Sequence, residues 1–215
     1  MYAEWSAECA AEDPVLEVPW AASRDAGVDC GFVDLRAEPS AIETIPEAEA
    51  HPPLMQALRA LNAVRSPLFT AKCDAWEMDA AEIAQLKLEM GIGLSFAVDD
   101  EDAHASAKHE DDALAFGFAS YIDCIVRDRA VFASFPRHEH AVRGLTRLAA
   151  QLEHPQSMLE CVLRPAFVHL DTPRQGYAVS VYVKAIDESP QRAWRRWAAA
   201  LTDVTALLRS RENIR

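Results

Sequence analysis

The chain has 215 residues, of which 50% are hydrophobic and 26% are charged, an ordinary composition for a globular protein. This apolar share can bury a core and excludes disorder as the dominant state, and no apolar run approaches the roughly 20 residues of a bilayer-spanning helix. The formal net charge of -13 opposes binding to phosphate backbones and anionic membranes, so we expect neither nucleic acid nor a membrane as a partner.

The charge is distributed unevenly along the chain. Residues 1–112 hold 24 acidic and 7 basic side chains, a net of -17, whereas residues 113–215 hold 10 acidic and 14 basic side chains, a net of +4. Three interpretations stay open. The two halves attract one another, the acidic half meets a basic protein partner, or the acidic surface is simply solvated.

The first 50 residues carry weak signals. Residues 3–11 are typical of a short helix, and residues 15–20 of an edge strand closed by Pro19. Residues 28–36 have apolar side chains on both faces, which predicts a buried strand. A short acidic helix is expected from Pro39 to about residue 50.

The next segment is more regular. Leucines at helical spacing and two starting prolines predict a helix over 52–65, and residues 68–76 follow as a strand. Asp79 is a suitable N-cap for a helix over 80–90, which Gly91 would end. A short strand is expected over 93–98.

Residues 99–113 are acidic and lack apolar periodicity, which is typical of a loop or linker. We therefore expect an acidic mixed α/β subdomain over 1–98, this loop, and a second subdomain over 114–215.

The second half predicts a hairpin, a helix, a hairpin and a helix. Its expected elements are strands over 114–126, 131–135, 158–170 and 177–186, and helices from Pro136 to about 154 and from Pro190 to about 208. Both helices would cover one face of a four-stranded antiparallel sheet. The predicted fold class is therefore α+β, with a ββαββα order that matches a circularly permuted ferredoxin-like arrangement.

The sequence contains no complete cofactor or metal motif. Gly91-Ile92-Gly93 lacks the third glycine of a dinucleotide loop and precedes a strand instead of following one. His138 and His140 are two apart on a predicted helix and point in different directions, and the acidic loop lacks the spacing of a calcium-binding loop. We expect no cofactor and no metal.

The cysteines are widely spaced, without a CxxC pair, and most lie in apolar runs. We expect all of them to be reduced thiols of a cytoplasmic protein, because disulfides are rare in that compartment and the first residues do not resemble a secretory signal. The cysteines are Cys9, Cys30, Cys73, Cys124 and Cys161.

Strand alternation places one polar set on the face of the sheet opposite the helices. The set is Tyr121, Asp123, Glu160, Arg164, Ser180, Tyr182 and Lys184. It is either a solvated row of cross-strand ion pairs or a ligand cleft partly covered by the first half of the chain. A bulge at Pro165 would turn Arg164 to the other face.

The absence of a complete catalytic or metal motif and the acidic surface favour one function, and the polar set supports an alternative. The first is a non-enzymatic binding or regulatory protein, with a homodimer as one arrangement, that acts through a small ligand or a partner surface. The alternative is an enzyme for a small anionic substrate, with Asp123 or Glu160 as general base and Arg164 as anion anchor.

Overall fold

A computed structural model describes residues 1–20, 31–92 and 116–210. The chain is mixed α+β, with a six-stranded sheet of order β1-β5-β6-β4-β3 in which β2 also pairs with β5. β1 and β2 run parallel to β5, and the other pairs are antiparallel. The strands are β1 (Tyr2–Ala7), β2 (Leu16–Val18), β3 (Leu68–Met78), β4 (Phe116–Val126), β5 (Ser157–Val168) and β6 (Arg174–Asp187).

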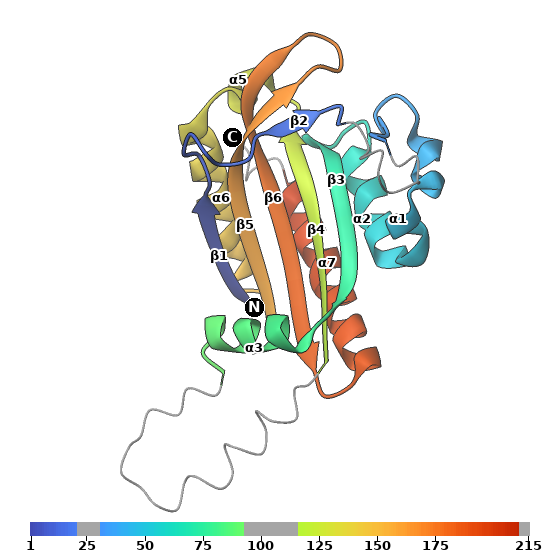
Figure 1. Cartoon of the computed structure of the whole chain (residues 1–215), viewed down its shortest axis with the longest axis vertical. Coiled ribbons are helices and arrows are strands. Elements are labelled where there is room, and N and C mark those ends of the chain that lie inside the picture. The colour runs from blue at the N-terminus through green and yellow to red at the C-terminus, as the bar shows by residue number, and fades with distance from the viewer. Residues whose placement is uncertain (21–30, 93–115, 211–215) are drawn as a thin grey trace, which may run out of the picture.

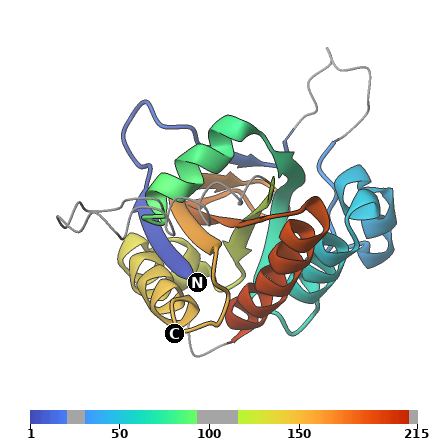
Figure 2. The same ribbon diagram turned by 90° about the horizontal axis from the view of Figure 1, so that it is seen from below.

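The helices lie on both faces of this sheet but cover them unequally. Figures 1 and 2 show α2, α6 and α7 along one face, whereas α3 crosses only one end of the other face. No helix among the described residues is long and apolar enough to cross a membrane. The helices are η2 (Pro39–Thr44), α1 (Pro46–Ala50), α2 (Pro52–Asn62), α3 (Ala80–Glu89), α5 (Arg129–Phe132), α6 (Phe135–Ala149) and α7 (Pro190–Arg209).

The main core lies between the sheet and the long helices. Alternate residues of β4, β5 and β6 pack there against α6 and α7, so the prediction that these two helices share a face is confirmed. Trp197 of α7 is fully buried, and its ring lies 4.6 Å from that of Phe118. Its indole Nε1 donates a hydrogen bond of 2.9 Å to Ser120 Oγ, which satisfies both buried polar groups.

Local sequence signals set several helix ends as predicted. Asp79 accepts hydrogen bonds from the first-turn amides of α3, the Glu82 carboxylate accepts one from the Asp79 amide, and Gly91 follows with a positive φ of 69°. Ser189 caps α7, and Pro190 occupies its first turn. The predicted helix over 52–65 is confirmed as α2, although it ends at Asn62, whose side chain hydrogen-bonds Thr70 of β3.

The predicted return strand over 131–135 is wrong. Asp128 instead accepts hydrogen bonds from the amides of Ala130 and Val131 and starts α5, and α6 follows directly. A short apolar run fits a helical turn as well as a strand, so periodicity could not separate the two. Residues 116–210 therefore supply three strands. β4 pairs with β6 on one side, and on its other side it pairs antiparallel with β3 from the first half of the chain. The predicted pairing of 158–170 with 177–186 is confirmed by β5 and β6.

Two predictions in the first 50 residues are also wrong. Residues 3–11 do not form a helix, because Tyr2–Ala7 pairs with β5 as β1, and such tertiary pairing outweighs the weak preference of a short isolated helix. Residues 31–36, the described part of the strand predicted over 28–36, are irregular and are held by Asp34, which accepts from the Arg36 amide and guanidinium. The predicted edge strand is confirmed as β2. The predicted strand over 93–98 and loop over 99–113 lie outside the described residues.

A candidate ligand-binding face of the sheet

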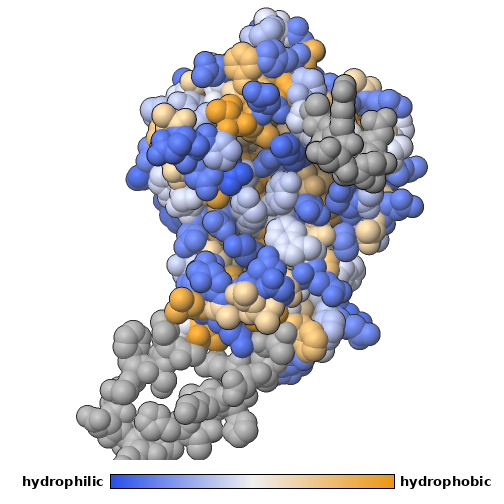
Figure 3. Space-filling view, viewed as in Figure 1, coloured by the Kyte–Doolittle hydropathy of each residue, from blue (hydrophilic) through white to orange (hydrophobic). Residues whose placement is uncertain are grey.

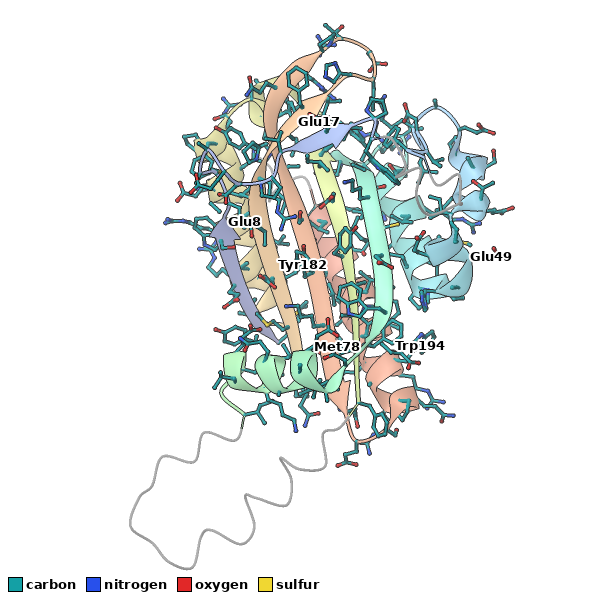
Figure 4. The ribbon with its side chains drawn as sticks, in the orientation of Figure 1. Glu8, Glu17, Glu49, Met78, Tyr182 and Trp194 are labelled. Atoms are coloured by element: carbon teal, nitrogen blue, oxygen red, sulfur yellow. The ribbon has the colours of Figure 1, made fainter. Side chains whose placement is uncertain are left out.

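Side chains from every strand of the main path form one row on the face opposite α6 and α7. Successive members are direct partners in the strand register: Glu4 of β1, Glu160 of β5, Tyr182 of β6, Tyr121 of β4 and Asp74 of β3. Figure 4 shows Tyr182 near the middle of the sheet, between Glu8 at one edge and Met78 near α3. We call this row, together with Asp123, Arg164, Ser180 and Lys184, the polar face.

The polar face lies between two apolar clusters. At one end, Met158 and Ile186 are buried beneath Ile83 and Leu86 of α3. At the other end, a second cluster joins β2 and α5 to the sheet through Val18, Phe132 and Ile125. Figure 3 shows hydrophilic surface across the middle of this view, with hydrophobic surface above and below it. Two elements from the first half of the chain, α3 and β2, therefore border the polar face at its two ends.

The β5–β6 register explains why Arg164 lies on this face. It continues without a shift from Ser157 to Val168, so no bulge occurs at Pro165. Pro165 falls between the segment of β5 that pairs with β1, which ends at Leu163, and the segment that pairs with β2, which begins at Ala166. The missing amide of proline is tolerated at such a break in the pairing of a strand.

Two ion pairs hold the basic side chains in place. Lys184 Nζ lies 2.8 Å from Glu160 Oε2, and Arg164 Nε donates to Glu8 Oε2 at the same distance of 2.8 Å. All four side chains remain partly exposed, so solvent weakens both pairs. Each basic side chain is therefore compensated by one carboxylate.

Asp123 is different because it is buried without a cationic partner in contact. Its exposed fraction is 5%, and Oδ1 accepts a hydrogen bond of 2.5 Å from Ser180 Oγ. Burial raises the pKa of Asp123, and the Ser180 hydrogen bond and the charges of Arg164 and Lys72 offset only part of this. Its surroundings therefore favour the protonated form of Asp123.

Three aromatic rings lie side by side on β3, β4 and β6. The ring of Tyr121 is 6.4 Å from that of Trp76 and 5.7 Å from that of Tyr182. Burial, followed by the charges of Asp123 and Asp74, raises the pKa of Tyr121 to about 12. This phenol therefore stays protonated at neutral pH, and the three rings offer a stacking surface with hydroxyl groups.

A cavity adjoins the polar face at the β3 edge. The β3–β4 register shifts between Thr70 and Cys73, and β-bulges are common beside functional sites. The cavity has a volume of about 470 Å³, within the range of small-molecule sites. Asp74 and Tyr121 line both it and the polar face, and its other polar lining residues include Lys72 and Glu47.

The sequence missed the residues that β1 and β3 bring to this site. Glu4 and Glu8 belong to a segment predicted as a helix, and Lys72, Asp74 and Trp76 to a strand for which no partner was predicted. Strict alternation along 68–76 would have placed Asp74 and Trp76 on the face of Leu68, because the bulge between Thr70 and Cys73 reverses the alternation; only the observed pairing with β4 places them on the polar face.

The other candidate sites lie elsewhere. His138 is buried, with Nδ1 3.1 Å from the Ser134 carbonyl oxygen, whereas His140 is exposed on another face of α6. Within the described ranges, no group of three His, Cys, Asp or Glu side chains is arranged to hold a metal ion. Cys9, Cys73, Cys124 and Cys161 are free thiols, and Cys30 lies outside the described residues.

Comparison of the chain with protein-family models, with curated proteins and with solved structures finds no match.

Proposed function

We propose that the protein is a non-enzymatic binding protein that takes a small ligand on the polar face. One observation carries this proposal: a continuous row of paired polar and aromatic side chains crosses the sheet from Glu4 to Asp74, beside a cavity of small-molecule size. A concave apolar space with a few convergent polar groups is the usual form of such a site. A cytoplasmic location, where its free cysteines stay reduced, is part of the same proposal.

We also propose that β3, β4, α6, β5, β6 and α7 form a circularly permuted ferredoxin-like unit. In its support, β4 and β5 both run antiparallel to β6, which lies between them, and α6 connects them. β3 takes the place beside β4 that a strand after α7 would otherwise fill. In this arrangement both helices cover one face, which leaves the polar face available to a ligand.

An enzyme acting on a small anionic substrate is the second candidate, and Asp123 favours it. A buried carboxyl with a raised pKa, next to a hydroxyl and an open face, has the properties of a general base. In this candidate Arg164, oriented by Glu8, would anchor the anion. Turnover of a bound compound that the Asp123→Asn variant loses, while still binding it, would favour the enzyme.

The binding proposal is tested by ligand-induced thermal stabilisation across a metabolite panel. Tyr182→Ala removes the central ring of the polar face. Tyr177→Ala makes the same change on the same strand but on the opposite face, where Tyr177 packs against Phe135. We expect at least one compound to stabilise the wild type and Tyr177→Ala but not Tyr182→Ala. A chain that no compound stabilises, and that instead forms a stable complex with a basic protein, would contradict the proposal.

A further inference from the structure

We infer that the ligand of this site is a protonated amine with an apolar body, whose body occupies the cavity at the β3 bulge and whose ammonium group meets Asp74 and Asp123. This inference rests on the proposed function, because it names the chemical class that the polar face and the adjoining cavity would bind together.

The cavity wall favours an apolar body. Val33 and Leu35 line it from the segment before η2, Ile45 and Pro46 from the junction of η2 and α1, and Leu58 from α2. Burying an apolar group against such side chains is favourable by roughly 25 cal/mol for each Å² removed from water. A ligand that is polar throughout would leave this wall without complementary contacts.

The end of the cavity that meets the polar face is acidic. Asp74 lies at this end, Glu47 also lines the cavity, and Asp123 is the next residue after Tyr121 on the same face of β4. These carboxylates affect the pKa values of two neighbouring groups. Burial, followed by the charges of Glu47, Asp74 and Asp123, raises the pKa of Cys73 to about 12. Burial, followed by the charges of Asp123 and Asp74, raises the pKa of Tyr121 to about 12 as well. A cation placed there gains from the same charges.

The basic side chains near the site already have partners. Arg164 is paired with Glu8, and Lys184 with Glu160. Lys72, the one basic residue among the described residues that line the cavity, has its Nζ 5.4 Å from the centroid of the Trp20 ring. An anionic ligand would therefore have to displace existing contacts while it faces three carboxylates, which is electrostatically unfavourable.

Asp123 and the aromatic rings supply specific partners for an ammonium group. Asp123 is more than nine-tenths buried and accepts the Ser180 hydrogen bond at Oδ1, so an N–H donor from a ligand would add a charge-assisted hydrogen bond at Oδ2. The rings of Tyr121 and Trp76, with centroids 6.4 Å apart, would supply the cation–π contacts that ammonium ligands commonly make, whereas the Tyr182 ring already has Lys184 Nζ 5.8 Å from its centroid.

The inference is tested by calorimetric titration of the full chain at neutral pH with three probes of similar shape: 2-phenylethylamine, 2-phenylethanol and 3-phenylpropanoate. We expect the amine to bind about tenfold to a hundredfold more tightly than the alcohol, as for charge-assisted hydrogen bonds, and the carboxylate to bind most weakly. Asp74→Asn and Asp123→Asn should each weaken amine binding about tenfold and leave alcohol binding unchanged. Asp203→Asn, the same change on α7, is the matched control.

A substitution in the cavity locates the apolar body. Val33→Phe fills part of the cavity and should weaken the amine and the alcohol alike. Tighter binding of the carboxylate than of the amine, or unchanged amine binding in both Asp→Asn variants, would overturn the amine inference. Failure of the amine to bind would also overturn it. If a compound from the metabolite panel still stabilises the wild type but not Tyr182→Ala, the proposed binding function stands although the amine inference fails. The two failures are therefore distinguishable.

Discussion

Ser180 of β6 donates a hydrogen bond of 2.5 Å to Oδ1 of Asp123, its direct register partner on β4. Both residues are almost completely buried, with exposed fractions of 1% and 5%, although they lie on the face that the long helices leave uncovered. The pair therefore places a carboxyl group of controlled protonation at the base of the proposed site.

The ionisation of Asp123 should affect stability in one direction. Its pKa in the folded state lies above the ordinary value of 3.8, so the folded chain holds this proton more tightly than the unfolded chain. This contribution is complete below the ordinary pKa and is lost as pH rises through the folded-state pKa. We expect the stability of Asp123→Asn relative to wild type to increase between about pH 3 and about pH 7 in urea unfolding. A difference that stays constant over this range would contradict the raised pKa.

Removing Arg164 should have a small effect on stability. The Arg164 and Glu8 side chains are 24% and 40% exposed, so their ion pair is screened by solvent. We expect a coupling energy of about 1 kcal/mol or less in a double-mutant cycle of Arg164→Ala and Glu8→Ala. A loss of about 3–5 kcal/mol in Arg164→Ala would show a covered charge network instead.

The position of α7 depends on Trp197. Trp197→Phe removes the indole donor to Ser120 Oγ and leaves a buried hydroxyl without this partner, which should lower the free energy of unfolding by about 1–3 kcal/mol. Trp194 is half-buried on the same helix, so Trp194→Phe should cost less than about 1 kcal/mol. Equal effects of the two substitutions in urea unfolding would contradict this packing.

Substitutions of two glycines test the finding that α5 stands where a return strand over 131–135 was predicted. A Cβ at Gly176 of β6 would clash with the Phe132 carbonyl oxygen of α5 and lie 2.6 Å from the Phe132 ring, so Gly176→Ala should cost about 1–3 kcal/mol. Gly144 on α6 has open space, and Gly144→Ala should stabilise the chain by about 0.5–1 kcal/mol. A stabilising Gly176→Ala in thermal unfolding would argue against the contact with α5.

Alternation of side chains within three long strands predicted part of the polar face. Tyr121 and Asp123, Glu160 and Arg164, and Ser180, Tyr182 and Lys184 follow a period of two in segments whose strand state was predicted. Their placement on one face needed only the absence of a bulge, and the registers of β4, β5 and β6 meet this condition. Whether the face binds a ligand stays a prediction.

The remaining members of the site depend on pairings between distant segments. β3 and β4 are far apart in the chain, and local periodicity carries no information about which strands become neighbours. The bulge between Thr70 and Cys73 interrupts alternation within β3 as well, so the side on which Lys72 and Asp74 lie follows only from the observed register. Tertiary pairing also decides the state of Tyr2–Ala7, whose composition fits a helix as readily as a strand.

Chemical-shift mapping of the backbone amides, with the best stabilising compound of the panel, tests the ligand-binding role of the polar face most directly. The account predicts that the largest changes fall on the central residues of β4, β5 and β6 and on β3 near Asp74, and that they saturate with ligand. Changes centred on the outer surfaces of α6 and α7, or an absence of saturable changes with every compound, would contradict it.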